Sequence, residues 1–442
     1  MQQDELFFMR QPWAYDPDCH RPARPDDEWG FATQSLHAGF RPIVNMGRFN
    51  TFTLPIVPSM TYPYERFDKI PYPVYGRTKT PTTSVLEERL AVLEGGEACV
   101  TAGSGSQALF SLLFTIARPG DNIVTSLMMF GEGYKQAATI MPERCGVSFR
   151  FVRDLHDPKA WDAAIDARTK LVWIETPSNP TLHVTDIAAV AEAAHSRGVP
   201  LLVDNTTATA ALQRPMDLGA DIVLLSVTKF LAGNATVLGG AIVGPESLTE
   251  DIRWNTTEFT GCTMQPFDSW LTVQYLETLS LRMERHSSNA LALAEYLAAH
   301  PKVSHVNYPG LPDHPQHALA MRQMKAGGGM LSFVVKGGIP AVRTVMDSLK
   351  LIIHAVTFGT SRTIVMHPRT ITHEHMTQEE RDHAGIDDAE VRVRRRAHRH
   401  SPGVAAAELL AGELAVAHAR ELLGQAQVGQ VVVGAPLGVG HV

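Results

Sequence analysis

The chain has 442 residues, of which 44% are hydrophobic and 19% are charged, and its formal net charge is -7. This length allows two or three domains, the composition is that of an ordinary globular protein, and the mild charge gives no reason to expect nucleic acid binding. No apolar run is long enough to cross a membrane. The four cysteines form no CxxC pair, so we expect no disulfide framework, no metal site and a cytoplasmic location.

Three regions are expected along the chain. Residues 1–80 are rich in proline and aromatic residues with little periodicity, and they predict an extended N-terminal arm. Residues 81–275 alternate helical and short apolar segments, and they predict a large domain. Residues 276–442 begin with a long helical segment, SLRMERHSSNALALAEYLAAH, and predict a smaller domain whose tail changes in character after about residue 393.

The middle region has the pattern of a parallel α/β sheet. Two amphipathic segments, TSVLEERLAVLEGG and SQALFSLLFTIARPGD, predict helices that end at Gly-Gly and Pro-Gly. Five short apolar segments predict strands, namely NIVTS, VSFRFV, KLVWIE, VPLLVD and DIVLLS. Helices or loops separate them at roughly even spacing, which is typical of βαβ units. In the last region, GGGMLSFVVKGG predicts an antiparallel strand of a smaller α+β domain.

Polar residues follow the predicted strands at their carboxyl ends, where open parallel sheets bind ligands. Asn179 follows KLVWIE, Asp204 ends VPLLVD, and Lys229 comes soon after DIVLLS. A Gly-Ser turn at residues 102–106 precedes the helix SQALFSLL. Each feature alone is common in caps and surface turns, but their joint occurrence in this order predicts one shared crevice.

Together these residues are what pyridoxal 5'-phosphate (PLP) chemistry needs. A lysine such as Lys229 must lose its proton to form an imine with the cofactor aldehyde, and a partly buried site near cations lowers the pKa of its amine. A carboxylate such as that of Asp204 keeps the pyridine nitrogen protonated and so strengthens the electron sink. The phosphate needs hydrogen-bond donors at a helix N-terminus. The candidate donors are Gly105, Ser106, Ser226 and Thr228.

The chain resembles the cystathionine synthase and lyase family of PLP enzymes, also called the Cys/Met metabolism family, from about residue 32 to 393. The matching motifs include ATQSLHAG, YGRTKTPTTSVLEERLAVLEGG, SGSQA, ETPSNPTL, VDNT, ADIVLLSVTKFLAG, SLRMERH and VNYPGLPDHPQH. The resemblance implies PLP-dependent fold type I, an aspartate-aminotransferase-like α/β fold. Its sheet is rich in parallel strands, and its C-terminal domain is a smaller α+β unit.

The resemblance also implies roles for single residues. Lys229 matches the Schiff-base lysine, Asp204 matches the pyridinium partner, and the four candidate donors match the phosphate cradle. Tyr75 and Arg77 match a Tyr-x-Arg pair that reaches the phosphate of the neighbouring subunit. The expected protein is therefore a homo-oligomer, a dimer of dimers, whose active sites are shared between subunits.

Three further residues match the substrate side of the family's pocket. Asn179 matches an asparagine near the cofactor's phenolic oxygen and the substrate, and Arg392 matches the arginine that holds the substrate carboxylate. Thr357 falls where the family usually has a serine near that carboxylate.

The chain departs from the family pattern at four places. Phe130 stands where the family stacks a tyrosine on the cofactor ring, and a phenylalanine cannot donate or accept a proton. Thr207 replaces a phenylalanine after VDNT, and residues 233–236 read Gly-Asn-Ala-Thr instead of Gly-His-Ser-Asp. The basic run after Arg392 replaces an apolar strand. The first two departures predict a reshaped substrate side of the pocket.

The expected activity is γ-replacement or elimination on an activated homoserine-type amino acid, as in transsulfuration. A γ- or β-lyase acting on cystathionine or methionine would share all the named residues, so the sequence leaves the leaving group, the nucleophile and the choice of synthase or lyase open. A hypothesis of another class is a non-catalytic PLP-binding paralogue, suggested by Phe130 and the altered tail. The intact set of Lys229, Asp204, Arg77 and Arg392 argues against it.

Overall fold

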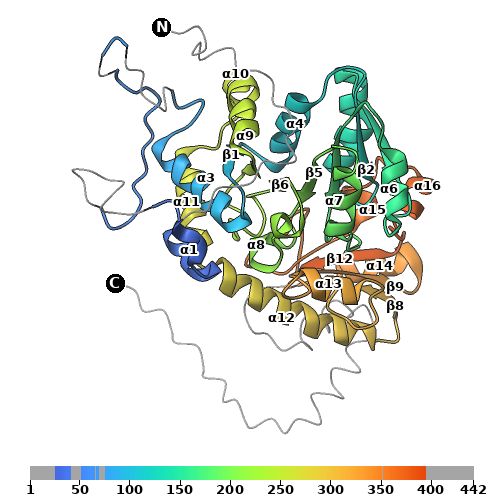
Figure 1. The fold of residues 1–442 in the computed structure, drawn as a ribbon. Helices are drawn as coiled ribbons and strands as arrows, with labels where there is room; N and C mark the ends of the chain where they lie inside the picture. The colour runs from blue at the N-terminus through green and yellow to red at the C-terminus, as the bar shows by residue number, and fades with distance from the viewer. Residues whose placement is uncertain (1–24, 41–50, 65, 69–74, 351, 395–442) are drawn as a thin grey trace, which may run out of the picture.

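The computed structural model describes residues 25–40, 51–64, 66–68, 75–350 and 352–394. They form a large sheet flanked by helices and a smaller sheet beside it (Figure 1). Parts of the predicted arm and nearly all of the predicted tail lie outside the described residues. Within the described arm, Phe31–His37 forms helix α1, which the low periodicity of the sequence did not indicate. In the described parts of the chain, no helix is long and apolar enough to cross a membrane.

The large sheet has seven strands in the order β1-β7-β6-β5-β4-β2-β3. Its strands are β1 (Ala98–Ala102), β2 (Asn122–Ser126), β3 (Ser148–Val152), β4 (Thr169–Glu175), β5 (Leu201–Asp204), β6 (Ile222–Leu225) and β7 (Gly240–Gly244). The strands β2 to β6 pair in parallel and confirm the five predicted strands. The antiparallel strand β7, which pairs with β6 and β1, was not predicted, and neither was β1.

Helices and helical turns separate the strands. The first half of the chain contains η2 (Pro25–Glu28), α3 (Pro81–Glu94), α4 (Gly105–Ile116), α5 (Gly131–Lys135), η4 (Gln136–Cys145), α6 (Pro158–Ala164), α7 (Ile187–His195), α8 (Thr209–Leu212) and η5 (Pro215–Leu218). The second half contains α9 (Glu246–Ile252), η6 (Arg253–Thr257), α10 (Glu258–Thr260), α11 (Pro266–Leu276), α12 (Leu279–Ala298), α13 (His317–Gln323), α14 (Gly338–Asp347), α15 (Pro368–Ile371) and α16 (Gln378–His383).

The two predicted helices before β2 begin and end at capping residues. In α3 the Thr80 hydroxyl accepts the Thr83 N–H at 3.2 Å, and the helix ends at Gly95, whose φ of 85° suits glycine. In α4 the Ser104 hydroxyl accepts the Gln107 N–H at 3.1 Å. The Ser104 cap therefore fixes where this helix begins, directly after β1.

The smaller sheet has five strands in the order β10-β11-β12-β9-β8. They are β8 (Val303–Asn307), β9 (Met330–Val335), β10 (Ile353–His354), β11 (Ile364–Met366) and β12 (Glu390–Arg394). Strand β9 pairs antiparallel with both β8 and β12, which confirms the strand expected in GGGMLSFVVKGG. Helix α12 contacts α1 at one end and β8 and β9 further along, so it links the large domain to the small one (Figure 1). The division of the chain at about residue 276 stays a prediction.

Both faces of the large sheet are buried, as expected for parallel strands covered by helices. On one face, residues of α4 and η4 pack on β2, β4 and β6. On the other face, residues of α6 and α7 pack on β3, β4 and β5. The strand ends are therefore the part of the parallel sheet where polar side chains can reach a ligand.

The close approach of β7 to the start of α4 gives a stability prediction. A Cβ atom at Gly240 would overlap the Ser104 carbonyl oxygen, whereas one at Gly244 of the same strand would find its nearest neighbour at 3.4 Å. Gly240→Ala should therefore lower the free energy of unfolding by about 1–3 kcal/mol through overpacking. Thermal unfolding followed by circular dichroism measures this, with Gly244→Ala as the matched control. Equal melting temperatures for the two variants would contradict it.

Candidate active site

A cavity of about 260 Å³ lies at the carboxyl ends of the parallel strands. It is lined by residues from β4, β5, β6, the start of α4 and the small sheet. The structure brings together here ten of the twelve residues to which the sequence gives a cofactor or substrate role. They are Gly105, Ser106, Phe130, Asn179, Asp204, Ser226, Thr228, Lys229, Thr357 and Arg392.

Two buried carboxylates face one another in register at the end of the sheet. Glu175 ends β4 and pairs with Asp204, which ends β5. Burial raises the pKa of Asp204 to about 6, although hydrogen bonds from Thr206 lower it in part. Burial and the neighbouring Asp204 charge raise the pKa of Glu175 well above its ordinary value. A positively charged ring nitrogen placed against Asp204 would lower the pKa of Asp204 again and keep it ionised, as its role in the resembling family implies.

Lys229 reaches the cavity from the turn that follows β6. Its Nζ donates to the Thr357 hydroxyl at 3.3 Å and lies 5.0 Å from the centre of the Phe358 ring. Burial and the charge of Arg392 lower the pKa of Lys229 to about 8, although Glu132 opposes the shift. Near pH 8 a much larger fraction of this amine is therefore neutral and nucleophilic than of an ordinary lysine amine.

Arg392 comes from β12 of the small sheet and closes the cavity opposite the large sheet. It is fully buried, and it donates to Asn179 Oδ1 at 2.8 Å and to the Thr357 carbonyl at 3.2 Å. Its Nε is buried and has no hydrogen-bond partner among the described residues. A guanidinium with an unsatisfied N–H donor in a cavity can donate hydrogen bonds to a substrate carboxylate.

The start of α4 supplies the predicted phosphate site. Gly105 lies so close to Ser226 that a Cβ atom there would come within 2.8 Å of the Ser226 Cβ. The Thr228 hydroxyl is held by Gly239, which it contacts both as donor, at 3.1 Å, and as acceptor, at 3.0 Å. Free backbone N–H groups at a helix N-terminus and nearby hydroxyls are suited to a phosphate dianion. The amine, the buried carboxylate and this donor set together fit PLP.

Phe130 precedes α5 and is placed by its main chain. Its backbone N–H donates to Glu175 Oε2 at 2.7 Å. The phenol of Tyr134, one turn further, is already used, because it donates to Glu380 at 2.7 Å. Tyr134 therefore does not replace the hydroxyl that Phe130 lacks.

Sequence reasoning missed two acidic residues of the cavity. Glu175 accepts the N–H groups of both Phe130 and Asn179, each at 2.7 Å. It is the last residue of the predicted strand KLVWIE, as Asp204 is of VPLLVD, so its place at the strand end was the signal that could have found it. Glu132 lines the cavity from an exposed position on α5, two residues after Phe130.

Three predicted residues do not line the cavity. Tyr75 and Arg77 lie in a loop before α3, where the Arg77 guanidinium is 4.8 Å from the centre of the Tyr75 ring. Arg77 also lies 3.8 Å from Glu258. Thr207 lies outside the cavity lining and donates to the Pro177 carbonyl at 2.6 Å. The Thr207 hydroxyl is thus turned to the main chain, and the reshaping of the substrate side at this position stays a prediction.

Comparison with known proteins gives a single family. A family model described as Cys/Met metabolism PLP-dependent enzyme matches residues 32–395. L-methionine gamma-lyase of Pseudomonas putida is 39% identical over 82% of this chain and 92% of its own. O-acetyl-L-homoserine sulfhydrylase of Corynebacterium glutamicum is 36% identical over 83% of this chain and 93% of its own. Cystathionine gamma synthase from Xanthomonas oryzae in complex with cystathionine superposes with a TM-score of 0.82 at 37% identity, over 87% and 97% of the two chains.

The lowered pKa of Lys229 predicts how the apoprotein reacts with PLP. The rate of covalent attachment should rise with pH up to about 8 and then level off. An ordinary lysine amine would continue to gain reactivity up to roughly pH 10.4. Absorbance of the attached cofactor gives the rate, and borohydride reduction followed by peptide mapping gives the site.

Arg392→Met is the informative variant, because it removes one cause of the shift and should move the break to higher pH. A Lys229→Ala protein that still carries reducible, covalently attached PLP would refute the assignment of Lys229.

Proposed function

The chain belongs to the Cys/Met metabolism PLP-dependent enzyme family, and from that premise we propose that it catalyses γ-replacement, or the related elimination, on an activated homoserine-type amino acid. It is a PLP enzyme whose substrate is an amino acid. The observation that carries the proposal is the meeting of Lys229 and Arg392 in one cavity, linked through Thr357. This arrangement can hold a substrate carboxylate beside an amine that moves protons.

Each residue of the cavity has a distinct task in this proposal. Bound PLP supplies an electron sink that stabilises negative charge on the substrate carbons. Lys229 holds the cofactor in the resting enzyme and then, as a free amine, carries protons between substrate carbons. Arg392 binds the substrate carboxylate, and Asn179 fixes the orientation of Arg392 through a hydrogen bond of 2.8 Å. Asp204 keeps the ring nitrogen charged.

The phosphate and the ring are held by the remaining residues in the proposal. The donors at the start of α4 and after β6 bind the phosphate, and the Phe130 ring stacks on the cofactor. Because Phe130 has no hydroxyl, either Lys229 or Glu132 protonates the leaving group, or the leaving group departs without a proton. Glu132 is a candidate since it lines the same cavity.

A γ- or β-lyase acting on cystathionine or methionine is the second candidate. It is favoured by the similarity to L-methionine gamma-lyases, which act through the same family fold. A non-catalytic paralogue is not supported, because the family and its relatives are enzymes and the reactive residues converge in one cavity.

We also propose a dimer of dimers with shared active sites in the cytoplasm. Tyr75 and Arg77 lie outside the cavity of their own chain, as residues that serve a neighbouring subunit would. Large apolar side chains in the described arm and in residues 259–267 are exposed, which favours burial against another copy. They are Met60, Tyr64, Phe67, Phe259 and Phe267. The free thiols of Cys99, Cys145 and Cys262 agree with a reducing compartment.

The proposed reaction predicts a dependence on the leaving group. Activated homoserines with leaving groups of graded basicity should be consumed, and mass spectrometry should identify replacement or keto-acid products. Phe130→Tyr should raise turnover of the more basic leaving groups, by up to about 10²–10⁴-fold, because a positioned acid is restored. Glu132→Gln should lower the turnover of the same substrates if that carboxyl supplies the proton.

The control is a leaving group that needs no proton, for which wild type and both variants should turn over alike. Lack of turnover of every activated homoserine, cystathionine and methionine would refute the proposed function. A profile that neither variant changes would show that these two positions take no part in proton transfer.

Shared active sites predict complementation between two inactive variants. Lys229→Ala removes the reactive amine, whereas Arg77→Ala removes the proposed contact with the neighbour's phosphate. A hybrid dimer contains one site with both residues intact, so tandem-affinity-purified hybrids should regain activity. Hybrids that are shown to form and yet stay inactive would refute the shared site.

A further inference from the structure

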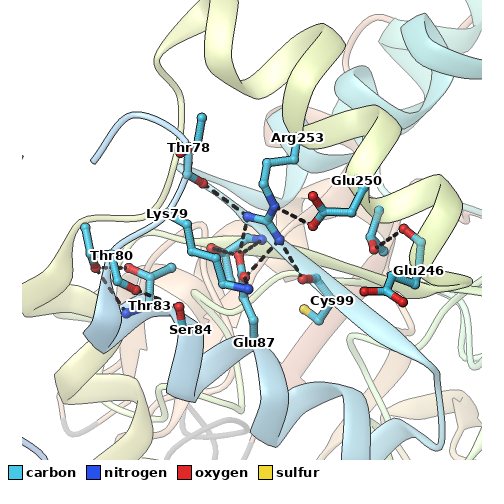
Figure 2. A network of polar contacts seen from close by, with 12 residues as sticks. Thr78, Lys79, Thr80, Thr83, Ser84, Glu87, Cys99, Glu246, Glu250 and Arg253 are labelled. Carbon is cyan, nitrogen blue, oxygen red and sulfur yellow. Dashed lines mark hydrogen bonds and ion pairs between the residues drawn. The ribbon is translucent and has the colours of Figure 1, made fainter. Parts of the chain in front are cut away.

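A buried ion-pair network lies at the base of the loop that carries Tyr75 and Arg77 (Figure 2). Its centre is the pair of Arg253 and Glu87, whose side chains are 1% and 2% exposed. Arg253 donates to Glu87 through Nη2 at 2.9 Å and through Nη1 at 3.2 Å. Its Nε donates to Glu250 at 2.9 Å. Every nitrogen of this guanidinium thus has an acceptor.

Arg253 and Glu87 also contact the loop itself. Arg253 Nη1 donates to the carbonyl of Thr78 at 3.1 Å, and Lys79 Nζ lies 3.2 Å from Glu87 Oε2. Thr78 in turn folds the loop, because its N–H and its hydroxyl donate to the Tyr75 carbonyl at 3.1 and 2.8 Å. A chain of hydrogen bonds therefore runs from Arg253 through Thr78 to Tyr75.

The outer part of the loop is attached more lightly. Gly76 N–H donates to the Met60 carbonyl at 2.8 Å, and Tyr75 forms an isolated bridge with Thr61. The Arg77 side chain is 47% exposed and contacts Glu258 at 3.8 Å. Because the Tyr75 and Arg77 side chains are exposed whereas Thr78 is buried, the anchor at Thr78 sets the position of the loop on the subunit.

We propose that Arg253, held by Glu87, is a positioning residue. It fixes the Tyr75–Arg77 loop in the place from which the loop contacts the cofactor phosphate of the neighbouring subunit. This proposal rests on the proposed shared site. Arg253 does not line the cavity of its own chain. Its effect on catalysis should therefore appear in the active site of the partner subunit.

The chemistry of the pair suits this role. A buried ion pair contributes little net stability compared with apolar side chains of similar volume, so its retention favours a directional task. Burial tends to raise the pKa of Glu87, but the charges of Arg253 and Lys79 lower it below its ordinary value. Glu87 therefore stays ionised and keeps the planar fork of Arg253 aimed at Thr78.

Arg253→Lys is the test variant, because it keeps the charge beside Glu87 but loses the fork that reaches the Thr78 carbonyl. Hydrogen exchange of the 75–80 segment in the full-length apoprotein should become about 10- to 100-fold faster, as expected for a lost bond from a charged donor. Arg89→Lys is the matched control, since Arg89 is equally buried and donates to the carbonyls of Leu36 and Ala38 instead. It should leave exchange of the 75–80 segment unchanged.

Hybrid dimers separate an effect on the partner from an effect within the subunit. Arg253→Lys paired with Lys229→Ala should regain one site of wild-type activity, because that site combines an intact lysine with an intact loop. Arg253→Lys paired with Arg77→Ala should regain none, since both loops are then defective. A defect confined to the active site of the Arg253→Lys subunit itself would give the opposite result, with activity regained beside Arg77→Ala and none beside Lys229→Ala.

The complementation results distinguish the positioning role of Arg253 from the shared site itself. If Arg77→Ala complements Lys229→Ala but Arg253→Lys does not, the positioning role is wrong and the shared site stands. If neither complements, the shared site itself is wrong. Unchanged exchange and activity in Arg253→Lys would also overturn the role. Should this variant fail to fold, Glu87→Gln takes its place in the same experiments, because it loosens the fork while keeping an acceptor for Thr101.

Discussion

The buried carboxylate of Glu175 is the contact on which the geometry of the site depends. It sits at the end of β4 beside Asp204, and its two oxygens accept the main-chain N–H groups of Phe130 and Asn179. From there a continuous set of hydrogen bonds crosses from the large sheet to the small one. It runs through Phe130, Glu175, Asn179, Arg392, Thr357 and Lys229. A buried carboxyl group is costly without hydrogen-bond partners, so the burial of Glu175 favours this arrangement of the loops around it.

This arrangement explains how the chain can lose the usual stacking tyrosine and keep the site. Phe130 is positioned by its backbone N–H, which any residue except proline would supply. The proposed stacking of the ring on the cofactor therefore needs no hydroxyl, while the acid and base chemistry of a hydroxyl is absent. Glu132, two residues further, offers the cavity a carboxyl group in the same segment. The backbone of residue 130 thus sets the position of its ring, while its side chain decides whether a proton donor is present.

Much of the fold could be predicted from the sequence, and the exceptions have physical causes. The five parallel strands are runs of large apolar residues, but β7 is GAIVG and β1 is ACVTA, whose small residues do not distinguish a strand from a loop. Strand ends located Asp204 and Lys229. Arg392 lies on another sheet, and only the resemblance could bring it to the cavity. The place of Glu132 in the cavity could not be predicted from the sequence, because the direction of its side chain depends on where α5 begins.

The Arg253–Glu87 pair joins the two segments that we propose to bind phosphate. Glu87 accepts the N–H and the hydroxyl of Thr101 at 2.9 and 3.0 Å, on the strand that leads directly into the start of α4. Arg253 holds Thr78 at the base of the loop proposed to serve the neighbouring subunit. One buried ion pair therefore contacts both the strand before the proposed phosphate cradle and the loop proposed to serve the neighbouring subunit. Apolar packing could fill the same volume, but only directional hydrogen bonds fix two backbone segments relative to each other.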